Sequence, residues 1–141
     1  MFRRIDDSIL VAPQIAPEDL AEAAALGVTL VINNRPDEEE AGQPEGQAIA
    51  NAAEQAGLAY RAIPVTHAGF SHGQVDAMVD ALEQAQGPVL AFCRSGTRST
   101  YLWALARAKM GDHPAVLTEK AEAAGYDLRS IRPMLDALAK Q

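Results

Sequence analysis

The chain has 141 residues, a usual size for one domain, so a hydrophobic core can form without disulfides or a structural metal. Its 19 acidic and 12 basic residues give a formal net charge of -7, which would repel nucleic-acid phosphates and anionic membrane surfaces. The single cysteine excludes an internal disulfide and is typical of a reducing compartment. We therefore expect one domain over residues 1–141, located in the cytoplasm, with neither nucleic acid nor a membrane as partner.

Apolar runs bounded by glycine and proline alternate with segments of helical period, which predicts an α/β fold built from strand and helix units. In the first half, strands are expected over residues 9–12, 28–33 and 58–63. Helices are expected to begin at Pro17 and near Gln47, and to end at Gly27 and Gly57. The stretch 34–46, with four consecutive acidic residues at 37–40, is interpreted as a solvated polar loop.

In the second half, Ser71 is expected to cap a helix that runs to about Gln86. The most apolar strand, residues 89–92, should lie at the centre of the sheet. Three further helices are expected over residues 99–110, from Pro114 to near Gly125, and over 128–139. Together these elements predict a central, mostly parallel sheet of four to five strands with helices on both faces.

The only cysteine, Cys93, lies where the expected central strand ends and the next helix has not yet begun. Ligands of open parallel sheets bind beyond the carboxyl ends of the strands, and a helix N-terminus adds unpaired N–H groups and a positive dipole end. Both effects, together with adjacent arginines, favour a nucleophilic thiolate. We therefore interpret Cys93 as a nucleophile, although a buried structural thiol is the alternative that composition leaves open.

The residues after Cys93 fit an anion-binding loop. Gly96 permits backbone angles at which successive N–H groups converge on one anion, and Arg98 offers a planar fork of donors. Ser99 is expected to cap the helix or to hydrogen-bond the sulfur. The predicted anion-binding set is Arg94, Ser95, Gly96, Thr97, Arg98 and Ser99.

The segment CRSGTR at 93–98 resembles the active-site loop of cysteine-based phosphatases and rhodaneses. Tyrosine and dual-specificity phosphatases place one residue more between cysteine and arginine, whereas CRSGTR matches the rhodanese pattern. The segments APEDLAEAAALGVTLVINNRPDEE, GLAYRAIPV and GPVLAFCRSGTRS are together similar to the phosphatase-like domain of beta-lactamase-hydrolase-like proteins, over about residues 9–110. The resemblance implies a cysteine-phosphatase-like fold, and a persulfide-dioxygenase-like hydrolase as a partner.

A phosphatase needs a general acid for the leaving group, and the loop after residues 63–65 contains no carboxylate before Asp76, which should lie in a helix. His67 and Asp37 are the candidate acids. Phe70 could cover the pocket, whereas Trp103 is expected in the core. His67, His72 and Cys93 do not show a known zinc-ligand spacing, so we expect neither a metal nor a cofactor.

Three functions remain open on the residues alone. The leading hypothesis is a sulfurtransferase that carries sulfur from a sulfane-sulfur donor as a Cys93 persulfide, because sulfite is already a good leaving group and needs no acid. The alternative is a phosphatase that hydrolyses a phosphoester through a phosphocysteine, with His67 or Asp37 as acid. The third is an anion-binding module without turnover.

Overall fold

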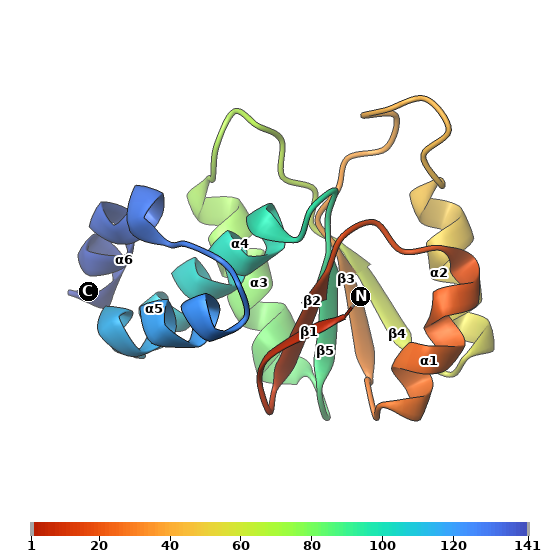
Figure 1. Ribbon diagram of the computed structural model, residues 1–141, viewed down its shortest axis with the longest axis horizontal. Helices are drawn as coiled ribbons and strands as arrows, with labels where there is room; N and C mark the ends of the chain where they lie inside the picture. The colour runs from red at the N-terminus through yellow and green to blue at the C-terminus, as the bar shows by residue number, and fades with distance from the viewer. Residues whose placement is uncertain (1, 141) are drawn as a thin grey trace.

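The structure is a computed structural model that describes residues 2–140. Five strands form one sheet in the order β1-β2-β5-β3-β4 (Figure 1). They are β1 (Arg3–Asp6), β2 (Ile9–Ala12), β3 (Leu30–Asn33), β4 (Ala59–Ala62) and β5 (Val89–Phe92). Only the edge strand β1 is antiparallel, to β2, and the other pairs are parallel. The predicted fold class is confirmed, and β5 is central as expected.

Six α-helices pack on this sheet. They are α1 (Leu20–Ala25), α2 (Gly46–Gln55), α3 (His72–Gln84), α4 (Thr97–Lys109), α5 (Pro114–Ala123) and α6 (Arg132–Ala139). Two short 3-10 helices, Pro17–Asp19 and Arg129–Ile131, precede α1 and α6. Within the described residues, no helix is both long and apolar enough to cross a membrane.

Helices cover both faces of the sheet, α1 and α2 on one side and α3 and α4 on the other, where α6 packs against α4 farther from the sheet (Figure 1). Successive side chains of a strand point to opposite faces, so each strand contributes to two cores. On one face Leu10 and Phe92 pack in a cluster with residues of α1 and α2. On the other face Val11 and Ala91 pack with residues of α3 to α6, including the fully buried Trp103, which confirms the core position expected for this side chain.

The parallel strands bring several loops to one edge of the sheet. Because β3, β4 and β5 run in the same direction, the segments that follow them all leave from their carboxyl ends. In Figure 1 the connections from β3 to α2 and from β4 to α3 rise beyond the sheet on either side of the β5–α4 turn. This edge is where the candidate site is assembled.

Candidate active site

Cys93 sits at the carboxyl end of the central strand and is fully buried. The backbone N–H of Gly96 donates a hydrogen bond to Cys93 Sγ over 3.1 Å. Gly96 has a φ of 91°, a left-handed conformation that costs glycine little and other residues more. It occupies the N-cap position of α4, which therefore begins at Thr97, two residues earlier than the sequence predicted. The turn brings an amide donor and the helix N-terminus to the sulfur.

Tyr126, from the segment between α5 and α6, supports this turn. Its hydroxyl donates to Ser95 O over 3.3 Å, and burial raises the pKa of Tyr126, which keeps the phenol protonated as a donor. A Cβ on Gly96 would overlap the Tyr126 hydroxyl and lie 3.1 Å from its Cζ. Sequence reasoning missed Tyr126 because nothing in its local pattern indicates contact with a loop thirty residues away.

Arg98 is buried and its guanidinium is held by two groups from other loops. Nη1 donates to Val65 O and to Glu39 Oε2, both at 2.6 Å, and Nη2 donates to Glu39 Oε1 at 2.9 Å. The hydrogen bonds to Glu39 raise the pKa of Arg98. The hydrogen bond from Arg98 lowers the pKa of Glu39 to about 2, so this carboxylate is ionised at neutral pH. Glu39 thus fixes the plane of the arginine fork.

The expectation that the acidic run at 37–40 is simply solvated is wrong at Glu39, whose side chain is only 17% exposed. Glu39 also accepts from Arg35 Nε at 2.9 Å. Arg35 itself is buried, and its Nη1 donates to Gln14 Oε1 at 3.0 Å. Arg35 lies two residues beyond the end of β3, and this position at the carboxyl end of a strand was the one signal that could have marked it.

Ser99 makes a different contact from either of those expected. Its hydroxyl donates to Asn34 Oδ1 over 2.8 Å, and Asn34 Nδ2 donates to Ile63 O over 2.9 Å. Both side chains are buried. The contact ties the first turn of α4 to the ends of β3 and β4, and the capping position belongs to Gly96 instead.

A pocket of about 270 Å³ opens over the loop. Its lining includes four residues of the predicted anion-binding set, Arg94, Ser95, Thr97 and Arg98, together with Thr66, His67, Gly69, Phe70 and Tyr101. The exposed Arg94 donates to Glu40 over 3.0 Å. Ser95 and Thr97 hydroxyls bond to each other at 3.0 Å. Arginine and histidine groups, with no Asp or Glu among the described lining residues, make this pocket suited to an anion.

The two candidate acids occupy different places. His67 lines the pocket, is 77% exposed, and has its Nε2 3.9 Å from Glu39 Oε2. Asp37 instead accepts the backbone N–H of Gly46 over 2.8 Å at the start of α2, and lines a separate pocket. The structure therefore brings His67 together with the Cys93 loop and does not bring Asp37 there.

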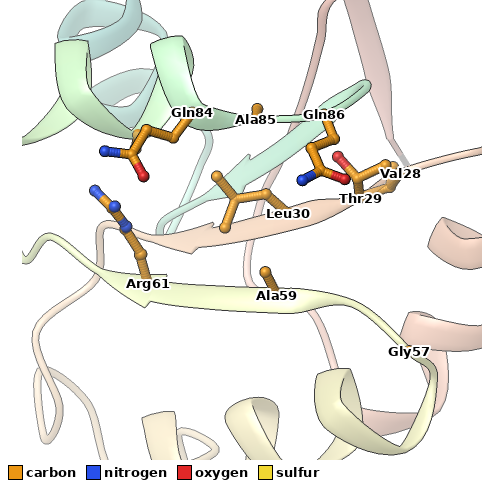
Figure 2. A pocket seen from close by; sticks show the side chains of 10 residues that line it. Val28, Thr29, Leu30, Gly57, Ala59, Arg61, Gln84, Ala85 and Gln86 are labelled. Carbon is orange, nitrogen blue, oxygen red and sulfur yellow. The ribbon is translucent and has the colours of Figure 1, made fainter.

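Other features of the described residues lie away from this chemistry. A pocket of about 470 Å³ lies between the starts of β3 and β4 and the end of α3, with Arg61 and Gln84 facing each other across it (Figure 2). It contains no residue of the Cys93 loop. Within residues 2–140 no group of three His, Cys, Asp or Glu side chains is arranged to hold a metal ion.

Residues 1–110 match the sequence profile of the beta-lactamase hydrolase-like protein, phosphatase-like domain. The chain belongs to this family. A beta-lactamase hydrolase-like protein of Agrobacterium fabrum is 36% identical over 108 residues, which cover 77% of this chain and 25% of the relative. The chain thus spans about a quarter of the length of the curated relatives it matches. These matches confirm the resemblance stated from the sequence.

Solved structures agree with this assignment. A candidate phosphatase of Neisseria meningitidis is 36% identical, with 96% of each chain covered and a TM-score of 0.84. The protein named Tk-PTP shares 17% identity with a TM-score of 0.78 over 99% of this chain and 97% of its own, which shows a common fold. The chain is a phosphatase-like α/β domain.

Proposed function

We propose that this domain hydrolyses phosphomonoesters through a covalent phosphocysteine on Cys93. The main support is the geometry of the loop, in which Cys93 and Arg98 lie on either side of the Gly96 turn. The fold also matches that of a candidate phosphatase over nearly its whole length. In the first step the thiolate attacks phosphorus and the bond to the leaving oxygen breaks. Water then attacks the phosphocysteine, which releases phosphate and restores the thiolate.

The loop residues have distinct roles in this proposal. The Gly96 N–H lies 3.1 Å from the sulfur and stabilises its negative charge. Arg98 and the exposed Arg94 supply positive charge to the phosphoryl oxygens. Because Arg98 already donates to Glu39 and Arg94 to Glu40, the phosphoryl group has to share both arginines with these carboxylates. Because Cys93 is fully buried, a neighbouring group has to move before a substrate reaches Sγ. We therefore expect the pocket to open further when an anion binds.

The leaving oxygen needs a proton, and His67 is the group we propose to give it. His67 shares the pocket with both arginines, whereas Asp37 is engaged at the start of α2. An exposed histidine is a poorly fixed donor, since its side chain is held by one long contact to Glu39. We therefore expect faster turnover of aryl phosphates, whose leaving groups need little protonation, than of alkyl phosphates.

Sulfur transfer is the second candidate, and two observations favour it. Only four residues separate Cys93 from Arg98, and no Asp or Glu lies among the described residues of the pocket lining. In this reaction the thiolate attacks the outer sulfur of thiosulfate, the S–S bond breaks, and sulfite leaves with the electron pair. The persulfide then passes its sulfur to a nucleophilic acceptor. A persulfide-dioxygenase-like hydrolase is the partner we would propose for this reaction.

One experiment separates the proposals. The protein is incubated with para-nitrophenyl phosphate or with thiosulfate, and product release and intact mass are measured. The phosphatase proposal expects nitrophenol release and a phosphate adduct on Cys93, both lost in Cys93→Ser. A gain of one sulfur with thiosulfate, without nitrophenol release, would replace it by sulfur transfer. Calorimetric binding of sulfate without either reaction would leave an anion-binding module.

A further inference from the structure

An apolar groove lies beside the anion pocket, between α3, α4 and α6. It has a volume of about 390 Å³, and its apolar lining consists of Phe70, Val75, Leu105, Met134, Ala137 and Leu138. Met134 is 41% exposed, one of three large hydrophobic side chains exposed to this degree among the described residues. Val75, Leu105 and Leu138 belong to the hydrophobic core, so the groove opens onto the core through the exposed Met134.

The groove adjoins the anion pocket, and the side chain of Phe70 separates the two. Phe70 lines both cavities, and its ring packs against Tyr101 with the centroids 6.2 Å apart. Thr97, Tyr101 and Leu105 succeed one another at intervals of four residues on α4, so they lie along one side of the helix. The distance from Thr97 to Leu105 along the helix axis is about 12 Å. A ligand that occupied both cavities would therefore have to pass over the Phe70 and Tyr101 rings.

The aromatic wall between the two cavities is fixed in place. Tyr101 OH donates to Asp127 O over 3.2 Å and accepts from Ser130 Oγ at 3.1 Å. These bonds hold the phenol toward the segment before α6, and the half-buried Phe70 packs against the ring. The boundary between the two cavities is therefore aromatic carbon, a surface suited to contact with a hydrocarbon.

We propose that this groove binds the hydrocarbon tail of the substrate while its anionic head lies on the Cys93 loop. The inference rests on the proposed function and narrows it to phosphomonoesters of alkyl or arylalkyl groups. One end of the two adjoining cavities carries Arg94 and Arg98, each paired with a carboxylate, and the other end is mostly apolar, with Ser71 and His72 at its margin. An amphiphilic anion matches both ends, whereas a small inorganic anion would leave the groove in contact with water.

The test uses methyl-, butyl- and octylphosphonate, which have no ester bond to hydrolyse, with calorimetry on the wild-type protein at monomeric ligand concentrations. Each methylene that enters a half-open apolar groove should tighten binding roughly twofold. We expect octylphosphonate to bind at least about tenfold more tightly than methylphosphonate. The ratio of these two affinities is the measured quantity for every variant.

Two variants address the groove, and two serve as matched controls. Met134→Gln makes its exposed wall polar, and Ala137→Phe fills it, so both should reduce the ratio several-fold. Leu26→Gln and Val116→Gln alter side chains that are 43% and 45% exposed, at the C-cap of α1 and on α5, outside the groove. These controls should keep the wild-type ratio. That result would exclude the possibility that any polar substitution of an exposed apolar side chain lowers the ratio.

Three results would overturn the inference. The first is equal affinity for methyl- and octylphosphonate, and the second is that no phosphonate binds. The third is a chain-length effect that is the same in Met134→Gln and Leu26→Gln as in wild type. Concentration-dependent self-association that Met134→Gln abolishes, without a chain-length effect, would assign the groove to a second copy of the chain instead. These results are separable from the proposed function: a phosphocysteine formed with equal phosphonate affinities would leave the function and remove only the tail site. A chain-length effect without formation of phosphocysteine would leave the tail site and remove the proposed phosphatase function.

Discussion

Glu39 holds Arg98 by two hydrogen bonds, one from each nitrogen of the guanidinium fork, at 2.6 and 2.9 Å. The contact joins the β3–α2 loop to the first turn of α4, 59 residues apart in sequence. Glu39 also binds Arg35, so one carboxylate lies between two buried cations. The negative charge offsets the cost of burying two guanidinium groups.

The neighbouring carboxylates Glu39 and Glu40 allow a matched test of this contact. Glu39→Gln leaves the buried Arg98 and Arg35 with a neutral partner, and should lower the free energy of unfolding by about 2–4 kcal/mol. Glu40 is 51% exposed; it contacts the exposed Arg94 at 3.0 Å and lies farther from Arg35, at 3.6 Å, so Glu40→Gln should cost about 1 kcal/mol or less. Urea unfolding at pH 7 measures both, and equal losses would contradict the structural role of Glu39.

The pH dependence of the same pair follows from the low pKa of Glu39, about 2 when folded against an ordinary value of 4.5. A lowered pKa stabilises the fold fully above pH 4.5, and the contribution is lost as the pH falls toward 2. The unfolding free energy of wild type minus that of Glu39→Gln should be constant from pH 7 to about 5 and shrink below 4.5. A difference that already declines between pH 7 and 5 would show that the carboxylate is not paired as described.

Gly96→Ala should damage both stability and turnover. Alanine at this position would be strained by the positive φ, and its Cβ would overlap the Tyr126 hydroxyl. We expect a loss of at least about 2 kcal/mol in unfolding free energy. Gly57→Ala is the matched control, because Gly57 has a φ of 81° and open space around it. Adding Tyr126→Phe to Gly96→Ala should recover part of the loss by removing the hydroxyl. Identical losses at the two glycines would show that Tyr126 does not confine the loop.

His67→Asn should affect turnover according to the leaving group. Without a proton donor, kcat/KM for an alkyl phosphate should fall by about tenfold to a hundredfold, while that for para-nitrophenyl phosphate should change little. Asp37→Asn is the comparison, since Asp37 contacts the start of α2 and should influence stability without this selectivity. The initial rates of both variants on both substrates decide the matter. If only Asp37→Asn lowered kcat/KM selectively for the alkyl phosphate, Asp37 would be the proton donor in place of His67.

The sequence predicts the layers of the fold well because its apolar periodicities reflect burial. Strands β2 to β5 and helices α2 to α5 lie within about two residues of their expected bounds. Strand β1 was not predicted, since Arg3 and Arg4 are exposed and its charged residues resemble a solvated terminus. It is an edge strand paired only to β2, and backbone pairing of this kind leaves little trace in side-chain pattern.

The site was predictable only where its residues are neighbours in the chain. The loop from Cys93 to Ser99 could be predicted as an anion site because a strand, a glycine and a helix start succeed one another locally, and this role stays a prediction. Glu39 and Tyr126 act on that loop from distant segments, so their roles depend on tertiary placement. Asp37 and Glu39 are both acidic and two residues apart, and only the path of the backbone decides which of them turns to the arginines.

The family match ends at residue 110, but the helices that follow belong to the same core: Leu117 of α5 and Leu135 of α6 pack in the cluster that includes Trp103. Tyr126, from the segment between these two helices, donates to Ser95 O in the Gly96 turn. A minimal domain cut at residue 110 would therefore expose one flank of α4 to water and leave the turn unbraced. Chimeras and fusions that exchange this unit should move the C-terminal helical pair with it.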